Sequence, residues 1–155
     1  QIKMINIGIT GQNGFIGTHL RNNLRLYSDK YNLIEFKRNC FEDKLALDFF
    51  VSKCDVIVHL AGLNRHNTPS VIYDTNIRLA SSLVESLNRS KSNPHLIMSS
   101  SSQESSDNLY GKSKKIGRSL ISNWANEKNA IFTGSITSII TNNLQNSIKV
   151  KLLGP

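Results

Sequence analysis

A glycine-rich turn near the start of the sequence constrains the fold more than any other feature. Gly11, Gly14 and Gly17 lie between a short apolar segment, residues 4–9, and an amphipathic segment, about residues 18–26. The apolar run predicts a buried strand, and the spacing of apolar residues after the glycines predicts a helix. A strand that passes into a helix through regularly spaced glycines is typical of α/β proteins.

The rest of the chain alternates the same two patterns. Short apolar runs predict strands at residues 32–36, 55–61, 94–100 and 131–140, and helical periodicity predicts helices at residues 42–53, about 77–87 and about 116–129. A polar loop is expected up to Pro69, and Leu45, Phe49 and Phe50 are expected on the apolar side of the 42–53 helix. This alternation predicts an α/β fold: a Rossmann-type doubly wound parallel sheet with helices on both faces.

Composition is that of a globular protein. Of the 155 residues, 39% are apolar and 19% are charged, which fits a single domain over residues 1–155. No apolar run is long enough to span a membrane, and no secretory signal is expected at the N-terminus. Cys40 and Cys54 have neither metal-ligand spacing nor a disulfide framework, so we expect no bound metal and a cytoplasmic location.

The net charge of +8, from 19 Lys and Arg against 11 Asp and Glu, suggests an anionic partner. That partner could be nucleic acid, a membrane surface or a phosphorylated small molecule, unless the charge only keeps the protein in solution. The basic residues are scattered, and no aromatic platform for stacking bases is evident. We therefore expect neither nucleic acid nor a membrane as partner.

The glycine turn suits the phosphates of a dinucleotide. One glycine permits a tight turn, another lets the backbone approach a pyrophosphate, and a third lets helix and strand pack closely. The start of the helix offers unpaired N–H groups and a partial positive charge. The alternative is an ordinary strand-to-helix turn in which glycine serves only backbone geometry. The predicted cofactor-binding residues here are Gly11, Gln12, Asn13, Gly14, Phe15, Ile16 and Gly17.

The end of the second predicted strand bears on which dinucleotide binds. An acidic residue about 20 positions beyond the glycines usually holds the unmodified ribose of NAD. Here Lys37 and Arg38 occupy that position, whereas Glu35 lies inside the predicted strand. Two cations favour the 2′-phosphate of NADP(H) over NAD(H), because a guanidinium can grip phosphate in a fork. The alternative is a basic strand end that only faces solvent.

Tyr110 and Lys114 are four residues apart, which places them on one face of a helix. A nearby ammonium favours the phenolate, so the pair suits proton transfer, although a lysine stem packing on a tyrosine ring gives the same spacing. Residues 99–102 are four serines that follow a predicted strand at the carboxyl edge of the sheet, where such folds bind ligands. A hydroxyl there can bind a substrate carbonyl oxygen or cap a turn.

Four motifs in chain order carry a family resemblance. Residues 10–17 read TGQNGFIG, 59–62 HLAG, 99–101 SSS and 110–114 YGKSK. Over about residues 4–129 the chain resembles the extended short-chain dehydrogenase/reductase family, also described as NAD-dependent epimerases/dehydratases. Residues 62–65, 101–103 and 107–110 resemble the CapF-like group of capsular-polysaccharide UDP-sugar reductases.

The resemblance implies NADP(H)-dependent reduction of a UDP-linked 4-keto-6-deoxy sugar in surface-polysaccharide precursor synthesis. Tyr110 would donate a proton to the keto oxygen, Lys114 would favour the phenolate and hold the nicotinamide ribose, and Ser101 would orient the carbonyl. Asn76 matches a structural asparagine of the family. The residues that would line the cofactor trough after the 55–61 strand are Leu60, Ala61 and Gly62.

Beyond residue 129 the resemblance ends. The family's Arg-x-Pro-Asn-type turn is not recognisable in residues 131–155, so we expect this chain to be the cofactor-binding part, without a sugar-binding subdomain or a cupin domain. Two alternatives remain open: a nucleotide-sugar epimerase or dehydratase that uses NAD, and a non-catalytic NADP-binding module. The resemblance also leaves a homodimer open.

Overall fold

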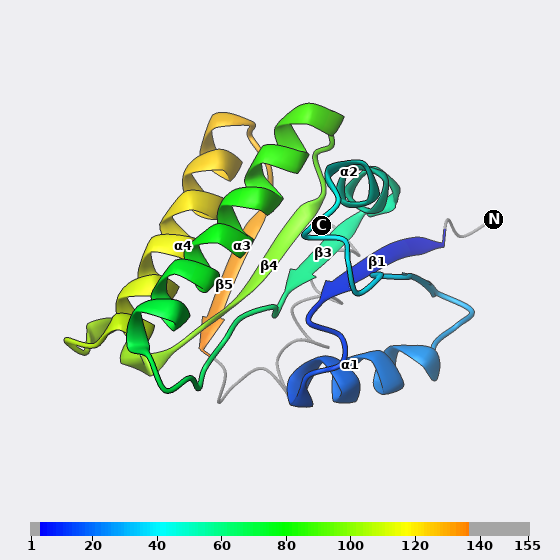
Figure 1. Ribbon diagram of the computed structural model, residues 1–155. Coiled ribbons are helices and arrows are strands. Elements are labelled where there is room, and N and C mark those ends of the chain that lie inside the picture. Colours follow the sequence, from blue (N-terminus) through cyan, green and yellow to red (C-terminus); the bar gives the residue numbers. More distant parts are fainter. Residues whose placement is uncertain (1–3, 137–155) are drawn as a thin grey trace.

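The apolar runs of the sequence form the strands of one sheet, which the computed structural model describes over residues 4–136 (Figure 1). In chain order the elements are β1 (Ile5–Thr10), α1 (Phe15–Arg25), β2 (Tyr31–Ile34), α2 (Lys44–Lys53), β3 (Val56–His59), α3 (Pro69–Ser90), β4 (His95–Ser100), the 3₁₀ turn η1 (Ser102–Ser105), α4 (Leu109–Glu127) and β5 (Phe132–Ile136). Of the predicted last strand, residues 137–140 lie outside the described residues.

The sheet has the order β2-β1-β3-β4-β5, and every neighbouring pair is parallel. From β1 the chain moves outward to β2, then crosses to β3 on the other side of β1. The strand order therefore reverses between β1 and β3, and such a reversal opens a crevice at the carboxyl ends of the two strands. The predicted doubly wound α/β fold is confirmed.

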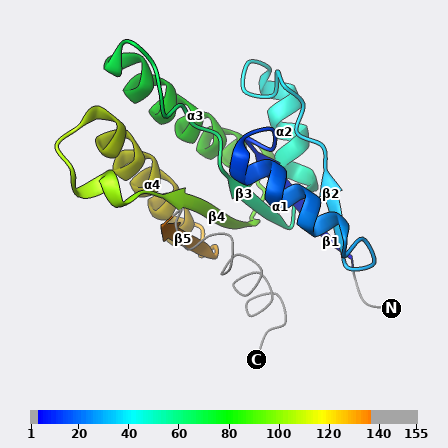
Figure 2. The same ribbon diagram turned by 90° about the horizontal axis from the view of Figure 1, so that it is seen from below.

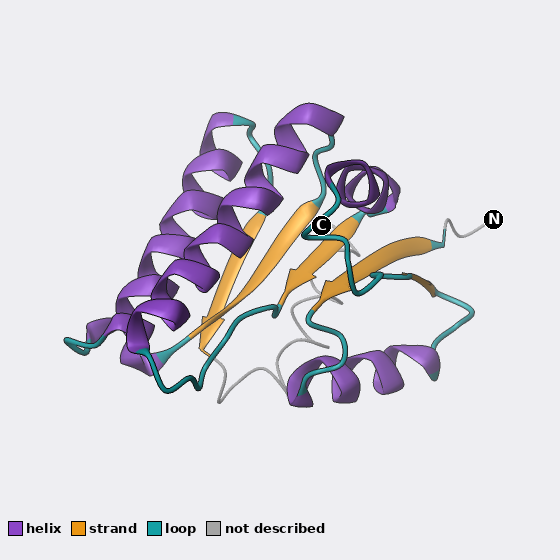
Figure 3. Cartoon of the chain, in the orientation of Figure 1, coloured by secondary structure: helices purple, strands orange, loops and turns teal. Residues whose placement is uncertain are grey.

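Helices cover both faces of the sheet (Figures 2 and 3). On one face, α2, α3 and α4 pack against Ile57 and Leu96 in a core that includes Phe50 and Trp124. On the other face, α1 packs against a second cluster that contains Ile7, Ile9, Val56, Val58 and Ile97. Adjacent strand residues thus face opposite cores, as the pleat of a doubly covered strand requires.

The structure corrects the predicted apolar face of α2. Phe50 is buried as expected, but Leu45 is 80% exposed and Phe49 is 65% exposed. The buried side is formed by Leu47, Phe50 and Val51, whose spacing of three and four residues makes one stripe on a helix. The prediction was wrong because the sequence offers two apolar stripes, and only packing against α3 decides between them.

Local signals set the starts of the helices. The Asp43 side chain accepts hydrogen bonds from the backbone N–H groups of Leu45 and Ala46 and so caps α2. The Asn108 side chain accepts a hydrogen bond from Gly111 N–H and caps α4. The α3 helix begins at Pro69, inside the predicted polar loop, because proline suits a first helical position. Within residues 4–136, no helix is both long and apolar enough to cross a bilayer.

A buried polar pair joins β1 to β3 at the carboxyl edge. Thr10 Oγ1 and His59 Nδ1 share a 2.8 Å hydrogen bond, and Thr10 Oγ1 also accepts a hydrogen bond from Ala61 N–H at 3.2 Å. His59 is only 3% exposed. Burial, together with the positive charge of Lys114, lowers the pKa of His59 to about 3, so the imidazole is neutral at pH 7.

The neutral state of His59 makes stability depend on pH in a predictable direction. Below its ordinary pKa of about 6.5 the imidazole gains a proton in the unfolded chain, whereas in the folded chain it stays neutral down to about pH 3. The stability that it contributes is therefore full above pH 6.5 and is lost as the pH falls toward 3.

We expect urea unfolding between pH 6 and pH 4 to show a steeper loss of stability in the wild type than in His59→Gln, by about 1.4 kcal/mol per pH unit. His66→Gln, which replaces an exposed imidazole in the same way, is the matched control variant. Equal slopes in the wild type and His59→Gln would contradict the neutral, buried state of His59.

Candidate active site

The glycine turn after β1 has a geometry that only glycine allows at two positions. Gly11 has a φ of +74°, and a Cβ atom there would lie 2.7 Å from the backbone nitrogen of Ala61. A Cβ atom at Gly17 would collide with the carbonyl oxygen of Gly11. The turn is therefore folded onto both the exit of β3 and the first turn of α1, which fixes where α1 begins.

The start of α1 is electrostatically uncompensated. Its N-cap is Gly14, no side chain caps it, and its first turn contains no acidic residue. The first backbone N–H groups of a helix have no partner inside the helix, and the helix dipole adds a partial positive charge to them. An anion is the ligand that such a helix start favours.

A cavity of about 410 Å³ lies at this helix start. The glycine turn, the exit of β3 and the first turn of α4 all contribute to it, at the crevice that the strand order creates. Its lining residues are Gly11, Gly14, Phe15, Ile16, Gly17, Leu60, Gly62, Asn64, Asn76, Ser99, Tyr110 and Lys114.

Tyr110 and Lys114 face this cavity from the first two turns of α4. Lys114 is 8% exposed, and its Nζ donates a 3.3 Å hydrogen bond to Ser99 Oγ. Burial lowers the pKa of Lys114 because it disfavours the charged ammonium, while the negative charge of Glu104 acts in the opposite direction. The fold thus brings Tyr110 and Lys114, which their spacing placed on one helix face, beside the glycine turn.

Asn76 on α3 clamps the loop after β3 to α4. Its Oδ1 accepts a 2.6 Å hydrogen bond from Leu63 N–H, and its Nδ2 donates to Leu63 O at 3.0 Å and to Ser113 Oγ at 3.1 Å. Ser113 Oγ in turn donates to the carbonyl oxygen of Tyr110 at 2.7 Å. One amide therefore fixes the loop that lines the cavity and the helix turn that carries Tyr110.

The serines after β4 divide between two cavities. Ser99 lines the cavity just described, whereas Ser101 lines a neighbouring cavity of about 500 Å³. Ser101 is the N-cap of η1, and its Oγ accepts a hydrogen bond from Gln103 N–H at 3.2 Å. The capping role considered for this serine run is therefore filled by Ser101, while Ser99 is the serine that faces the cavity with Tyr110 and Lys114.

A carboxylate that sequence reasoning missed holds the serine segment. Glu104 accepts hydrogen bonds from Ser100 Oγ and from Arg118 on α4, whose Nε lies 2.9 Å and Nη2 2.8 Å from Glu104 Oε2. Burial raises the pKa of Glu104, but the hydrogen bonds from Arg118 and Ser100 outweigh it and leave the net pKa below its ordinary value. Glu104 and Arg118 belong to no recognisable sequence motif, so only the fold reveals the link between them.

Lys37 and Arg38 follow β2 and are exposed, outside the cavity that contains Tyr110 and Lys114. Gln12, Asn13 and Ala61 also do not line that cavity. Gln12 instead ties the glycine turn to the exit of β2, because its Nε2 donates a 2.8 Å hydrogen bond to Phe36 O. Asn64 and Ser99 line the cavity although no role was assigned to them individually from the sequence.

Comparisons with known proteins show the family and the fold of this chain. The profile of the NAD dependent epimerase/dehydratase family matches residues 7–140, whereas a comparison with curated proteins finds no match. Among solved structures, the chain is similar to CapF, a capsular polysaccharide assembling protein of Staphylococcus aureus, with 30% identity over 84% of this chain and 33% of that chain and a TM-score of 0.66.

Two further structures share the fold. RMD from Pseudomonas aeruginosa complexed with NADPH has 18% identity over 86% of this chain and 53% of that one, with a TM-score of 0.74. UDP-glucuronic acid 4-epimerase from Bacillus cereus in complex with NAD has 22% identity over 84% of this chain and 55% of that one, with a TM-score of 0.69. The chain thus spans between a third and about half of each structure's length. With the profile matching most of its residues, the chain belongs to the NAD dependent epimerase/dehydratase family.

Proposed function

We propose that this chain is the cofactor-binding portion of an NADP(H)-dependent reductase that acts on a nucleotide-linked 4-keto-6-deoxy sugar in surface-polysaccharide precursor synthesis. One observation carries the proposal: a single cavity joins the uncapped start of α1 to Tyr110 and Lys114. A phosphate seat and a proton-transfer pair are the two things that a nicotinamide-dependent reductase needs in one place.

The residues present fit a dinucleotide. The diphosphate would lie on the N–H groups of Phe15, Ile16 and Gly17, which the close packing of Gly11 presents to the cavity. Leu60, Ala61 and Gly62 would border the cofactor beyond the end of β3. Lys114 would hold the nicotinamide ribose, since its ammonium is buried at the far side of the same cavity.

The chemistry follows from the same side chains. When bound, the reduced nicotinamide would supply a hydride to the carbonyl carbon of the sugar. Tyr110 would give its proton to the carbonyl oxygen, and Lys114 would stabilise the resulting phenolate. Ser101, which lines the neighbouring cavity, would orient the carbonyl, and the link from Glu104 to Ser100 and Arg118 holds its segment. One hydride and one proton convert the ketone to an alcohol.

Two observations support the choice of cofactor and substrate. Lys37 and Arg38 put positive charge after β2, where the adenosine ribose of a dinucleotide lies, and positive charge favours a 2′-phosphate. The 30% identity to CapF supports a nucleotide-sugar substrate on the way to capsular polysaccharide. The free, buried thiols of Cys40 and Cys54 suit the reducing, cytoplasmic setting that we propose.

Titration with NADPH and with NADH, followed by nicotinamide fluorescence, tests the binding proposal. We expect saturable binding of both dinucleotides through the shared diphosphate, with NADPH binding more tightly. Equal affinities would remove the preference for NADP(H) and favour an NAD-dependent epimerase or dehydratase. Absence of binding by either dinucleotide would overturn the proposal.

Tyr110→Phe tests the catalytic proposal, because it removes the proton that Tyr110 would donate and keeps the ring. We expect NADPH affinity to remain near that of the wild type. Hydride transfer to a UDP-linked 4-keto sugar, followed by loss of NADPH absorbance, should fall about 10²-fold or more. Tyr27→Phe, on a tyrosine outside the cavity, is the matched control and should transfer hydride as the wild type does. Unchanged turnover in Tyr110→Phe would exclude Tyr110 as the proton donor.

A further inference from the structure

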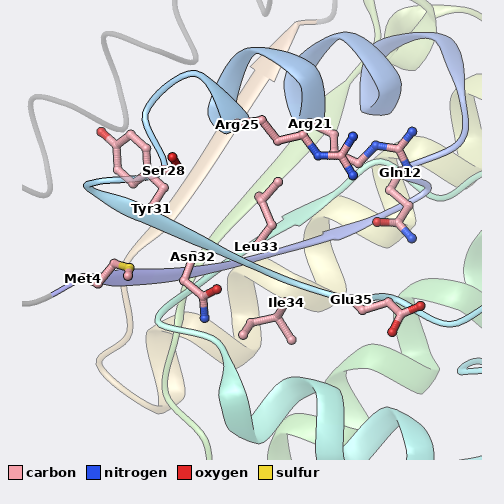
Figure 4. Close-up of a pocket in the computed structure, with 10 residues that line it drawn as sticks. All are labelled: Met4, Gln12, Arg21, Arg25, Ser28, Tyr31, Asn32, Leu33, Ile34 and Glu35. Atoms are coloured by element: carbon pink, nitrogen blue, oxygen red, sulfur yellow. The ribbon is translucent and has the colours of Figure 1, made fainter.

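A second cavity of about 530 Å³ lies between α1 and β2, next to the glycine turn (Figure 4). Arg21 and Arg25 line it from α1, Gln12 from the glycine turn, and Glu35 from the exit of β2. The proposed site for the diphosphate and nicotinamide uses none of these four side chains. In Figure 4 both arginine side chains extend from α1 in the direction of Gln12, while the Glu35 carboxylate points away from them.

The two arginines form a cationic pair, and neither guanidinium has an ion-pair partner among the residues that the structure describes. They are four residues apart on one helix, so their side chains share a face and repel each other. Among residues 4–136, no carboxylate forms an ion pair with either guanidinium. Arg21 Nε is buried without a hydrogen-bond partner, and buried polar groups in native proteins are almost always paired. An anion between the two guanidinium groups would offset their repulsion and accept hydrogen bonds from the N–H groups that face the cavity.

The position of the pair in the fold indicates which anion would fit there. Arg21 Nη1 donates a 3.2 Å hydrogen bond to Asn13 Oδ1, which places the guanidinium over the glycine turn. Gln12, from the same turn, donates to Phe36 O just beyond β2, so the turn and the strand exit meet at this end of the cavity. In dinucleotide-binding folds the 2′ position of the adenosine ribose lies where that turn meets the end of the second strand.

We propose that Arg21, assisted by Arg25, binds a phosphate monoester, namely the 2′-phosphate of the adenosine half of NADP(H). The inference rests on the proposed function, because the seat for the diphosphate places the adenosine ribose beside Arg21. It assigns a larger share of the cofactor preference to α1 than to Lys37 and Arg38, whose positive charge after β2 adds to it. The forked N–H groups of a guanidinium match the oxygens of a phosphate, and the dianion offsets the repulsion between the two cations.

Calorimetric titration of the 155-residue chain tests the inference with five probes: NADPH, NADH, adenosine 2′,5′-bisphosphate, adenosine 5′-monophosphate and inorganic phosphate. Arg21→Gln and Arg25→Gln each remove one cation from the cavity. Arg78→Gln removes an exposed arginine from α3, outside the cavity, and so controls for net charge. Lys37→Gln/Arg38→Gln tests the strand end for comparison.

We expect Arg21→Gln to weaken NADPH and adenosine 2′,5′-bisphosphate about 10- to 100-fold, the effect of losing a charge-assisted hydrogen bond. NADH and adenosine 5′-monophosphate should bind as they do to the wild type. Arg25→Gln should reduce the same preference less, because Arg25 is exposed and acts beside Arg21. Its exposure also makes it the variant to rely on if Arg21→Gln does not fold, as checked by circular dichroism. Arg78→Gln should match the wild type.

Several outcomes would overturn the inference and leave the proposed function standing. One is equal weakening of NADPH and NADH by Arg21→Gln, and another is a preference that only Lys37→Gln/Arg38→Gln removes. Competition by inorganic phosphate as strong as that by adenosine 2′,5′-bisphosphate would show a general anion site in place of a cofactor site. If the wild type binds neither NADPH nor NADH, the proposed function itself fails.

Discussion

The site depends on the backbone contact between the first and third glycines of the turn after β1. Because neither Gly11 nor Gly17 carries a Cβ atom, the turn lies directly against Ala61 and against the first turn of α1. This packing places an uncapped helix start at the point where the strand order reverses between β1 and β3. A side chain at either glycine would displace the helix start from the cavity, and with it the N–H groups that we propose to bind the diphosphate.

The opposite wall of the cavity depends on a different balance, between burial and charge. Lys114 is held inside the protein by Ser99 and within the field of Glu104, which offsets part of the cost of burying an ammonium. Glu104 is itself held by Arg118, four residues after Lys114 on α4. Asn76 joins the same helix to the loop after β3. Tyr110 and Lys114 are therefore positioned by polar links from α3, β4 and η1.

Much of the fold could be predicted because its signals are local. Continuous apolar runs such as Val56–His59 mark doubly covered strands, and the glycine spacing marks the turn before α1. The face of α2 could not be predicted, because Leu45 and Phe49 form as plausible a stripe as Leu47, Phe50 and Val51. Only the packing of α2 on α3, including the ion pair of Asp48 with Arg89, selects the second stripe.

Some residues of the candidate site could likewise be predicted from the sequence, and others could not. Tyr110, Lys114 and the glycines carry sequence spacing that has a physical meaning, and the structure places them around one cavity. A run of identical serines does not reveal which hydroxyl faces that cavity. The difference comes from the fold, because Ser99 lies inside β4 and Ser101 is the N-cap of η1. Arg21 and Glu104 belong to no sequence motif. The hydrogen bonds from Arg21 to Asn13 and from Arg118 to Glu104 form only when the chain folds.

The central claim is that the first N–H groups of α1 seat the cofactor diphosphate. Amide chemical shifts of the ¹⁵N-labelled chain, recorded with adenosine 5′-diphosphate and with adenosine alone, test it most directly. We expect the diphosphate, and not adenosine, to shift the Phe15, Ile16 and Gly17 amides most strongly, because only the diphosphate would accept their hydrogen bonds. Unchanged shifts at these three amides when the rest of the chain responds to the diphosphate would contradict the account.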